Sequence, residues 1–301
     1  MKEINSQKKF PERTDLSEEE ASELALELQK KLRDGEKPET DTILIKKLVT
    51  GLGDKRGLLR RTFSESLGMI GKSALPELRY ALLNSCNVTV RRAAAKTLKL
   101  IGDPSALPDL LQALLHDHDP VVQGSAVGAM AIFGEEAAEL LIEVLAKPNS
   151  SELQCGLASW GISFIGARAG RVLKRSALST NKKVRASSIA ALGDQIQLFS
   201  DKEAKKILCD AVNDPSIEVQ IEAIKLIGFL NDHEWDINLI ASKLNEASPE
   251  IRRQSALTLM KLKAINHIAI MNNILLKEKD TDVKNILKLC ISNLDGMSKS
   301  K

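Results

Sequence analysis

The chain has 301 residues, of which 43% are hydrophobic, 3% aromatic and 28% charged, and its net charge is only +3. This balance argues against nucleic acid as a partner, because a nucleic-acid groove needs a strong positive field and exposed rings. The four cysteines have no CxxC spacing and predict neither a zinc site nor a secreted disulfide framework. No apolar leader and no apolar run of about 18 residues occur, so we expect a cytoplasmic protein without a membrane partner.

Two tails and a separate first helix are expected outside the main body of the chain. Residues 1–14 are polar and aperiodic, which predicts a disordered tail, and residues 296–301 predict a second one. Residues 15–40 are expected to form an N-terminal capping helix and a linker. Ser17 and Glu20 have the spacing of a capping box at the start of that helix.

Between residues 41 and 295, a two-residue pattern recurs eight times: an aliphatic residue precedes Arg, Gln or Lys at the start of a stretch rich in Ala, Leu and Ile. The steps between the second residues of each pair are 31, 32, 31, 31, 35, 32 and 32, a period typical of helical-repeat arrays. The pairs are Leu59-Arg60, Val90-Arg91, Val122-Gln123, Leu153-Gln154, Val184-Arg185, Val219-Gln220, Ile251-Arg252 and Val283-Lys284.

Each repeat has the pattern of a helical hairpin. In the second repeat we expect helices over residues 75–83 and 90–101, because a polar turn separates them and Gly102 followed by Asp103 and Pro104 ends the second. No alternating run indicates a strand. The predicted fold is an all-α solenoid of about eight helical hairpins over residues 41–295, with about three extra residues near 195–201.

One face of the second helices changes character along the array. If Arg, Gln or Lys of each pair is position zero, positions −1, +3, +7 and +10 form the apolar face, and positions +1, +5 and +8 point the opposite way. In the third to fifth repeats that opposite face lacks charge, whereas Arg92, Lys96 and Lys225 occupy it in neighbouring repeats. The uncharged residues are Gly124, Gly128, Ala131, Cys155, Ser159, Ile162, Ala186, Ala190 and Gly193.

Two interpretations of this face remain open. It is either a smooth floor for a flat apolar ligand whose carboxylates meet the nearby cations, or a surface that packs on another helix, such as the N-terminal one. Trp160, at position +6, is either part of the core or a platform for the ligand. Cys155 is either a small residue chosen for fit or a thiol that holds the ligand.

The residues at position zero have a structural explanation. Arginines that recur with a repeat are expected to form a ladder with acids in the turns, as Arg60, Arg91, Arg185 and Arg252 would with Asp119 or Asp214. A metal enzyme built on such repeats would need paired His-Glu motifs, and only His233-Glu234 occurs, so no metal site is expected.

Residues 87–114, NVTVRRAAAKTLKLIGDPSALPDLLQAL, resemble HEAT repeats of the short subclass found in phycobilin lyases. Residues 155–166 and 184–195 resemble the E/F-type lyases, and within them the branch associated with phycoerythrin. The likeness covers residues 41–230. The Asn-His-Cys motif of the isomerising lyases is absent, so the resemblance implies attachment of a bilin without isomerisation.

The resemblance implies a HEAT-like solenoid that acts as a bilin lyase or chaperone. Its substrate would be a linear tetrapyrrole, phycoerythrobilin, with no tightly bound cofactor. Its partner would be a subunit of the phycobiliprotein phycoerythrin. A second lyase subunit is another candidate partner. The alternative is a non-enzymatic scaffold for phycobilisome assembly or degradation. No catalytic residue is assigned; the candidate ligand-binding residues are Arg92, Lys96, Gly124, Gly128, Cys155, Ser159, Trp160, Ala186, Ala190 and Lys225.

Overall fold

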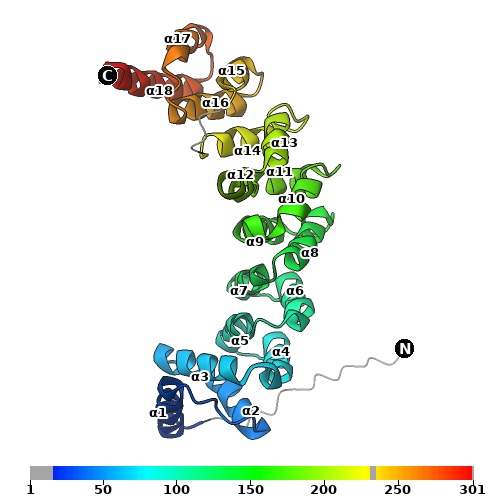
Figure 1. Cartoon of the computed structure of the whole chain (residues 1–301). Helices are drawn as coiled ribbons and strands as arrows, with labels where there is room; N and C mark the ends of the chain where they lie inside the picture. The colour runs from blue at the N-terminus through cyan, green and yellow to red at the C-terminus, as the bar shows by residue number, and fades with distance from the viewer. Residues whose placement is uncertain (1–15, 231–234, 300–301) are drawn as a thin grey trace. The chain divides into compact units, whose positions relative to one another are not determined.

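The computed structural model describes residues 16–230 and 235–299, and within these it contains helices and turns but no strand. The expected tail at residues 1–14 and the dipeptide His233-Glu234 lie outside the described residues. No helix in the described part is long and apolar enough to cross a membrane. The predicted all-α solenoid of helical hairpins is confirmed (Figure 1).

Eight pairs of consecutive helices form the hairpins of the described chain (Figure 1). Short 3₁₀ segments join successive hairpins at Gly71–Ala74, Pro104–Ala106, Ala131–Phe133, Gly166–Ala169 and Ile265–His267, and another, Lys243–Asn245, lies between the two helices of the seventh hairpin. The pairs are α2 (Thr42–Gly51) and α3 (Gly57–Ile70), α4 (Leu75–Asn84) and α5 (Val88–Ile101), α6 (Leu107–His116) and α7 (Pro120–Met130), α8 (Glu135–Ala146) and α9 (Glu152–Ile165), α10 (Gly170–Ser176) and α11 (Lys182–Ala190), α13 (Lys202–Ala211) and α14 (Ile217–Ile227), α15 (Ile237–Ser242) and α16 (Pro249–Lys261), and α17 (Ile268–Lys277) and α18 (Thr281–Lys299).

The chain divides into two compact units. Unit 1 contains the described residues up to Val144 together with Asn149–Gly161, and unit 2 contains Leu145–Pro148 and the described residues from Ile162 onward. The repeat period predicted one continuous array and gave no sign of this division. Each unit is described by itself below.

The N-terminal helix forms as its capping box predicts. In α1 (Glu18–Asp34), the Ser17 hydroxyl accepts a hydrogen bond from the Glu20 backbone, and the Glu20 carboxylate accepts one from the Ser17 backbone. Gly35 ends the helix with φ of 71°, a left-handed conformation that suits glycine. The buried side of α1 packs on α3, so within unit 1 this helix covers the first hairpin.

Two departures from the expected pattern occur in unit 2. The extra residues of the fifth step form a short helix, α12 (Gly193–Phe199), which ends at Ser200 with φ of 51°. The expected disordered tail from residue 296 is wrong as far as Lys299, because α18 continues to that residue. Once a helix has formed, each further residue adds one backbone hydrogen bond at a small cost in conformational entropy. The buried side chain of Leu294 also holds the last turns of α18 against the core.

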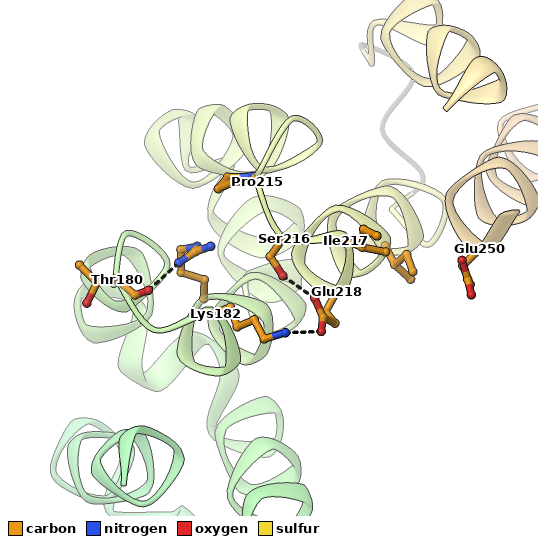
Figure 2. A pocket seen from close by; sticks show the side chains of 9 residues that line it. Thr180, Lys182, Pro215, Ser216, Ile217, Glu218 and Glu250 are labelled. Atoms are coloured by element: carbon orange, nitrogen blue, oxygen red, sulfur yellow. Dashed lines mark hydrogen bonds and ion pairs between the residues drawn. The ribbon is translucent and has the colours of Figure 1, made fainter. Parts of the chain in front are cut away.

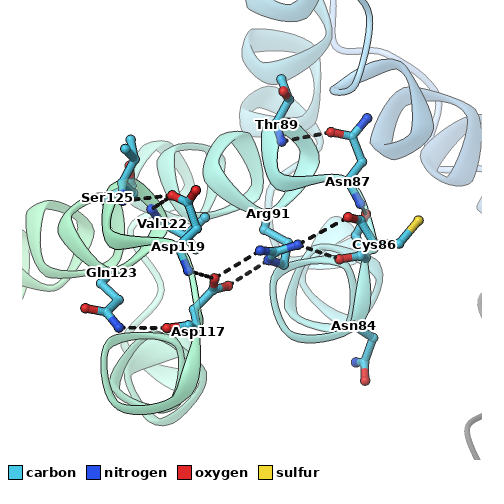
Figure 3. Close-up of polar contacts among 12 residues, drawn as sticks. Asn84, Cys86, Asn87, Thr89, Arg91, Asp117, Asp119, Val122, Gln123 and Ser125 are labelled. Atoms are coloured by element: carbon cyan, nitrogen blue, oxygen red, sulfur yellow. Dashed lines mark hydrogen bonds and ion pairs between the residues drawn. The ribbon is translucent and has the colours of Figure 1, made fainter.

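Three of the four arginines at position zero, Arg91, Arg185 and Arg252, form the predicted ladder with carboxylates of the next hairpin. Among the described residues Arg60 makes no such pair, because its guanidinium donates to the backbone carbonyls of Asp54 and Lys55. Arg91 donates through Nε and Nη2 to the two carboxylate oxygens of Asp117 at 2.7 and 3.0 Å, and through Nη1 to the Ser85 carbonyl at 2.9 Å (Figure 3). Asp119, the expected partner, instead caps α7. Arg185 repeats the arrangement with Asp214, as predicted.

The last such pair, Arg252 with Glu278, should make stability depend on pH. The Arg252 guanidinium, which donates at 2.8 and 2.7 Å, lowers the pKa of the Glu278 carboxyl to about 2. An unfolded glutamate titrates at about 4.3, so this stabilisation is present above about pH 4.3 and is lost as the pH falls toward 2.

Glu278→Gln should therefore lower the free energy of unfolding at neutral pH by about 1.5–3 kcal/mol, the range for hydrogen bonds to charged groups. It should also flatten the fall in stability between pH 4.3 and 2. Denaturant unfolding at a series of pH values measures both effects. Parallel curves for the two proteins across that interval would contradict the assignment.

Candidate functional site

The register of the fourth hairpin differs from the one predicted from sequence. In the other second helices the residue at position zero donates its backbone N–H to the cap residue four positions earlier, as Arg91 does to Asn87. In α9 the residue that does so is Cys155, whose N–H donates to the Ser151 carbonyl at 2.9 Å. Position zero is therefore Cys155 and not Gln154.

Gln154 has a different role, as the third residue of a capping box. Its backbone N–H donates to the Ser151 hydroxyl at 3.2 Å, and its side-chain oxygen accepts from the Ser151 backbone at 2.8 Å. Serine followed three residues later by glutamine is a helix-start pattern that can be read from sequence. In the sequence, Gln154 follows an aliphatic residue as the ladder residues do, so it was assigned to position zero. The prediction for this helix was therefore one residue too early.

With the corrected register, the outward face of α9 carries Gly156, Trp160 and Ser163. Ile162, which was expected on that face, is fully buried, and Leu153, which was expected in the core, is 47% exposed. The alternative that places Trp160 in the core is wrong, because this side chain is 49% exposed. Trp160 thus lies at position +5, the same position as Lys96 and Gly128 in the two preceding repeats.

Three successive second helices of unit 1 line an open hollow of about 430 Å³. The helix α5 supplies the two lysines on one side, α7 supplies the floor, and α9 supplies Leu157 and Trp160 on the other side. Its lining contains neither a carboxylate nor a histidine. The lining residues are Lys96, Lys99, Val121, Gly124, Ser125, Gly128, Ala129, Leu157 and Trp160.

The glycines of α7 let the side chains of α9 lie close to the α7 backbone. A Cβ atom at Gly124 would stand 3.6 Å from Leu157 Cδ2, and one at Gly128 would stand 3.5 Å from Trp160 Cη2. The floor is thus partly covered by α9, as the packing interpretation expects, and its use as a floor for a ligand stays a prediction. Ala131, expected on the floor, is fully buried. What remains open is a shallow space above the two glycines with an indole at its edge.

The cationic side of the hollow is built on α5. Arg92 and Lys96, at positions +1 and +5, are exposed as predicted. The pKa of Lys96 is lowered, first by its partial burial and then by repulsion from Arg92 and Arg60. Within residues 16–230 and 235–299, Lys96 forms no ion pair with a carboxylate. A bound anion would relieve this repulsion and stabilise the ammonium form.

The structure brings together four of the ten predicted residues in this hollow, namely Lys96, Gly124, Gly128 and Trp160. Arg92 lies on the same helix as Lys96 without lining the space. Cys155 and Ser159 are half-buried on α9, and the Cys155 thiol lies 4.0 Å from the Ser150 carbonyl oxygen. The sequence reasoning missed Leu157, which the serine–glutamine spacing at the start of α9 would have placed correctly.

The other three predicted residues belong to unit 2. Ala186 and Ala190 are half-buried on α11, which packs against α14. Lys225 lies on α14, where its Nζ is 3.3 Å from a carboxylate oxygen of Glu222. These residues do not line the hollow of unit 1.

Unit 2 has a larger and more polar hollow of about 750 Å³ at the N-terminal ends of α11, α14 and α16 (Figure 2). Its cations already have anionic partners, since Lys182 Nζ lies 2.6 Å from Glu218 Oε1 and the Arg185 guanidinium binds Asp214. Because these charges are satisfied within the protein, this space offers an anionic ligand less than the hollow of unit 1 does. No group of three metal-binding side chains occurs in the described part of the chain.

Two stretches, residues 75–156 and 171–256, match the family model of HEAT repeats, which defines the class of protein. A relative, bilin biosynthesis protein MpeU of Synechococcus sp. (strain WH8020), is 44% identical over 284 residues, which are 94% of this chain and 96% of that protein. The chain therefore belongs to the E/F-type phycobilin lyase family of HEAT-repeat proteins.

Solved structures of similar fold are more distant. Human deoxyhypusine hydroxylase in complex with glycerol is 17% identical with a TM-score of 0.36, over 84% of this chain and 96% of that one. The karyopherin Kap121p bound to the SUMO protease Ulp1p is 13% identical with a TM-score of 0.49, over 83% of this chain and 37% of that one. Neither bears on what this chain binds.

Proposed function

We propose that this protein is a bilin lyase that binds phycoerythrobilin and directs its thioether attachment to a cysteine of a phycobiliprotein subunit, that of phycoerythrin. The observation that carries the proposal is the hollow of unit 1, where an exposed indole, a glycine floor and an unneutralised lysine meet. A flat conjugated diacid is complementary to each of these features. The 44% identity to a protein named for bilin biosynthesis supports the same class of ligand.

The chemistry asks little of the lyase beyond positioning. The sulfur of the acceptor cysteine bonds to the ethylidene carbon of ring A, the carbon–carbon double bond is lost, and the thiol proton ends on the adjacent ring carbon. Nothing is oxidised or reduced. Holding two reactants in near-attack geometry can by itself remove about 7–11 kcal/mol of a barrier. A hollow lined by apolar side chains and lysines, without an acid–base pair, is suited to that role.

Co-production of the chain with the enzymes that make phycoerythrobilin tests the binding step. We expect the purified protein to be coloured, with a visible spectrum shifted from that of the free bilin because the hollow restricts its conformation. Denaturation should release the colour, since the bilin is substrate and not a covalent group of this chain. A protein that stays colourless would instead favour the non-enzymatic scaffold of phycobilisome assembly or degradation.

A further inference from the structure

Trp160 is half exposed, and one edge of its indole lies against α7. The side chain extends from α9 over α7, where its Cη2 and Cζ3 atoms lie 3.5 and 3.8 Å from the position that a Cβ of Gly128 would take. Because Gly128 has no side chain, the space between the indole edge and the α7 backbone stays open, although a single methyl group there would make only an ordinary contact. With 49% of the residue exposed, part of the indole borders the open space of the hollow, where an aromatic ring of a ligand can contact it.

Lys96 faces the same space from the opposite side. The pKa of Lys96 is lowered first by the partial loss of water around its ammonium group and then by repulsion from Arg92 and Arg60. Both effects disfavour the ammonium form. A carboxylate placed beside Lys96 would reverse this balance and form a charge-assisted hydrogen bond. The hollow therefore has a distinct anion end on α5 and a distinct aromatic end on α9.

We infer that this hollow holds a tetrapyrrole in one orientation, in which Lys96 binds a propionate carboxylate and Trp160 stacks on an outer pyrrole ring. The inference rests on the proposed function and names how its substrate lies. Tetrapyrrole propionates are carried by the two central rings, so anchoring them at α5 directs an end of the molecule across Gly124 and Gly128 toward α9. Lys96 and Trp160 line the same hollow, so a propionate on a central ring and the outer ring beside it can meet both side chains at once.

The two ends of the hollow should discriminate between ligands in different ways. Biliverdin and its dimethyl ester have the same conjugated rings, but the ester lacks both carboxylate charges. The purified chain should bind biliverdin at least about tenfold more tightly than the ester, a factor that corresponds to about 1.4 kcal/mol. Lys96→Met should weaken biliverdin binding about tenfold and leave the ester unchanged, whereas Lys96→Arg should keep the preference.

Replacement of Trp160 should affect both ligands alike. Trp160→Leu should weaken the acid and the ester by the same factor, about tenfold, because stacking on a ring does not depend on the carboxylates. Trp160→Phe should retain most of the binding. Leucine can still pack against Gly128 but cannot stack on a ring, whereas phenylalanine can do both. Comparison of Trp160→Leu with Trp160→Phe therefore separates loss of stacking from loss of packing. Lys30→Met removes an exposed lysine of α1 that does not line the hollow, so it is the matched control and should change nothing.

Absorbance titrations without any acceptor protein provide the dissociation constants, and thermal melts show that each variant is folded. The orientation would be overturned if Lys96→Met weakened both ligands equally, or if leucine and phenylalanine at Trp160 behaved alike. A natural chain that binds neither ligand nor phycoerythrobilin would overturn the proposed function itself. A chain that attaches bilin to an acceptor, yet is indifferent to these substitutions, would overturn only the orientation.

Discussion

Gly128→Leu should reduce bilin binding by well over tenfold without destabilising the protein. The new side chain would fill the space above α7 and push the exposed Trp160 ring away from the floor, so a planar ligand could no longer enter. The fold should tolerate this change, because a Cβ at this position makes only an ordinary contact at 3.5 Å and leucine favours a helix over glycine by up to about 1 kcal/mol.

Gly156→Leu is the control for added bulk. Gly156 lies on the outward face of α9, a Cβ there meets nothing within 4 Å, and the residue does not line the hollow. Its substitution should leave bilin binding intact. Thermal melts and bilin titrations on the two variants compare the effects directly. A loss of about 1–3 kcal/mol in stability for Gly128→Leu would instead identify the floor as a packed interface.

Gly161→Ala should cause a clear loss of stability from a single added methyl group. A Cβ at Gly161 would lie 2.5 Å from Val127 Cγ1 and 2.8 Å from Leu141 Cδ1, and both of these side chains are fully buried. Overpacking a core in this way costs about 1–3 kcal/mol, and the gain in helix propensity of about 1 kcal/mol offsets only part of it.

Gly156→Ala, five residues earlier on the same helix, should raise the free energy of unfolding instead of lowering it. With open space around its Cβ, it should stabilise the protein by about 0.8–1 kcal/mol through helix propensity alone. Urea unfolding with a common m-value measures the difference between the two variants. Equal stability of both alanine variants would show that α9 does not approach α7 and α8 as closely as the structure has it.

The hairpins could be predicted from sequence because each depends on local signals that recur. Apolar positions repeat with the helical period, and a capping residue stands four positions before each position zero. Such signals act within one hairpin and do not depend on how repeats associate. The division into two compact units carries no comparable local signal.

The candidate site could be predicted only in part, and the limit was the fourth hairpin. Gln154 fits both a ladder position and a capping box, and a cysteine at position zero has no counterpart in the other repeats. A shift of one residue rotates a helix face by about 100°, which moved Trp160 from the hollow to the edge of the core. The glycine floor was found because glycine is unfavourable on an exposed helix unless something needs the space.

The most direct test of a lyase role is whether bilin becomes covalently attached to an acceptor when this chain is present. Phycoerythrobilin synthesis enzymes and each phycoerythrin subunit would be co-produced with the chain, without it, and with its Gly128→Leu variant. Colour that stays with an acceptor subunit on a denaturing gel is the measurement. We expect it with the natural chain, at a cysteine identified by mass spectrometry, and not in the other two cases. Equal covalent colour with and without the chain for every acceptor subunit would contradict the assignment.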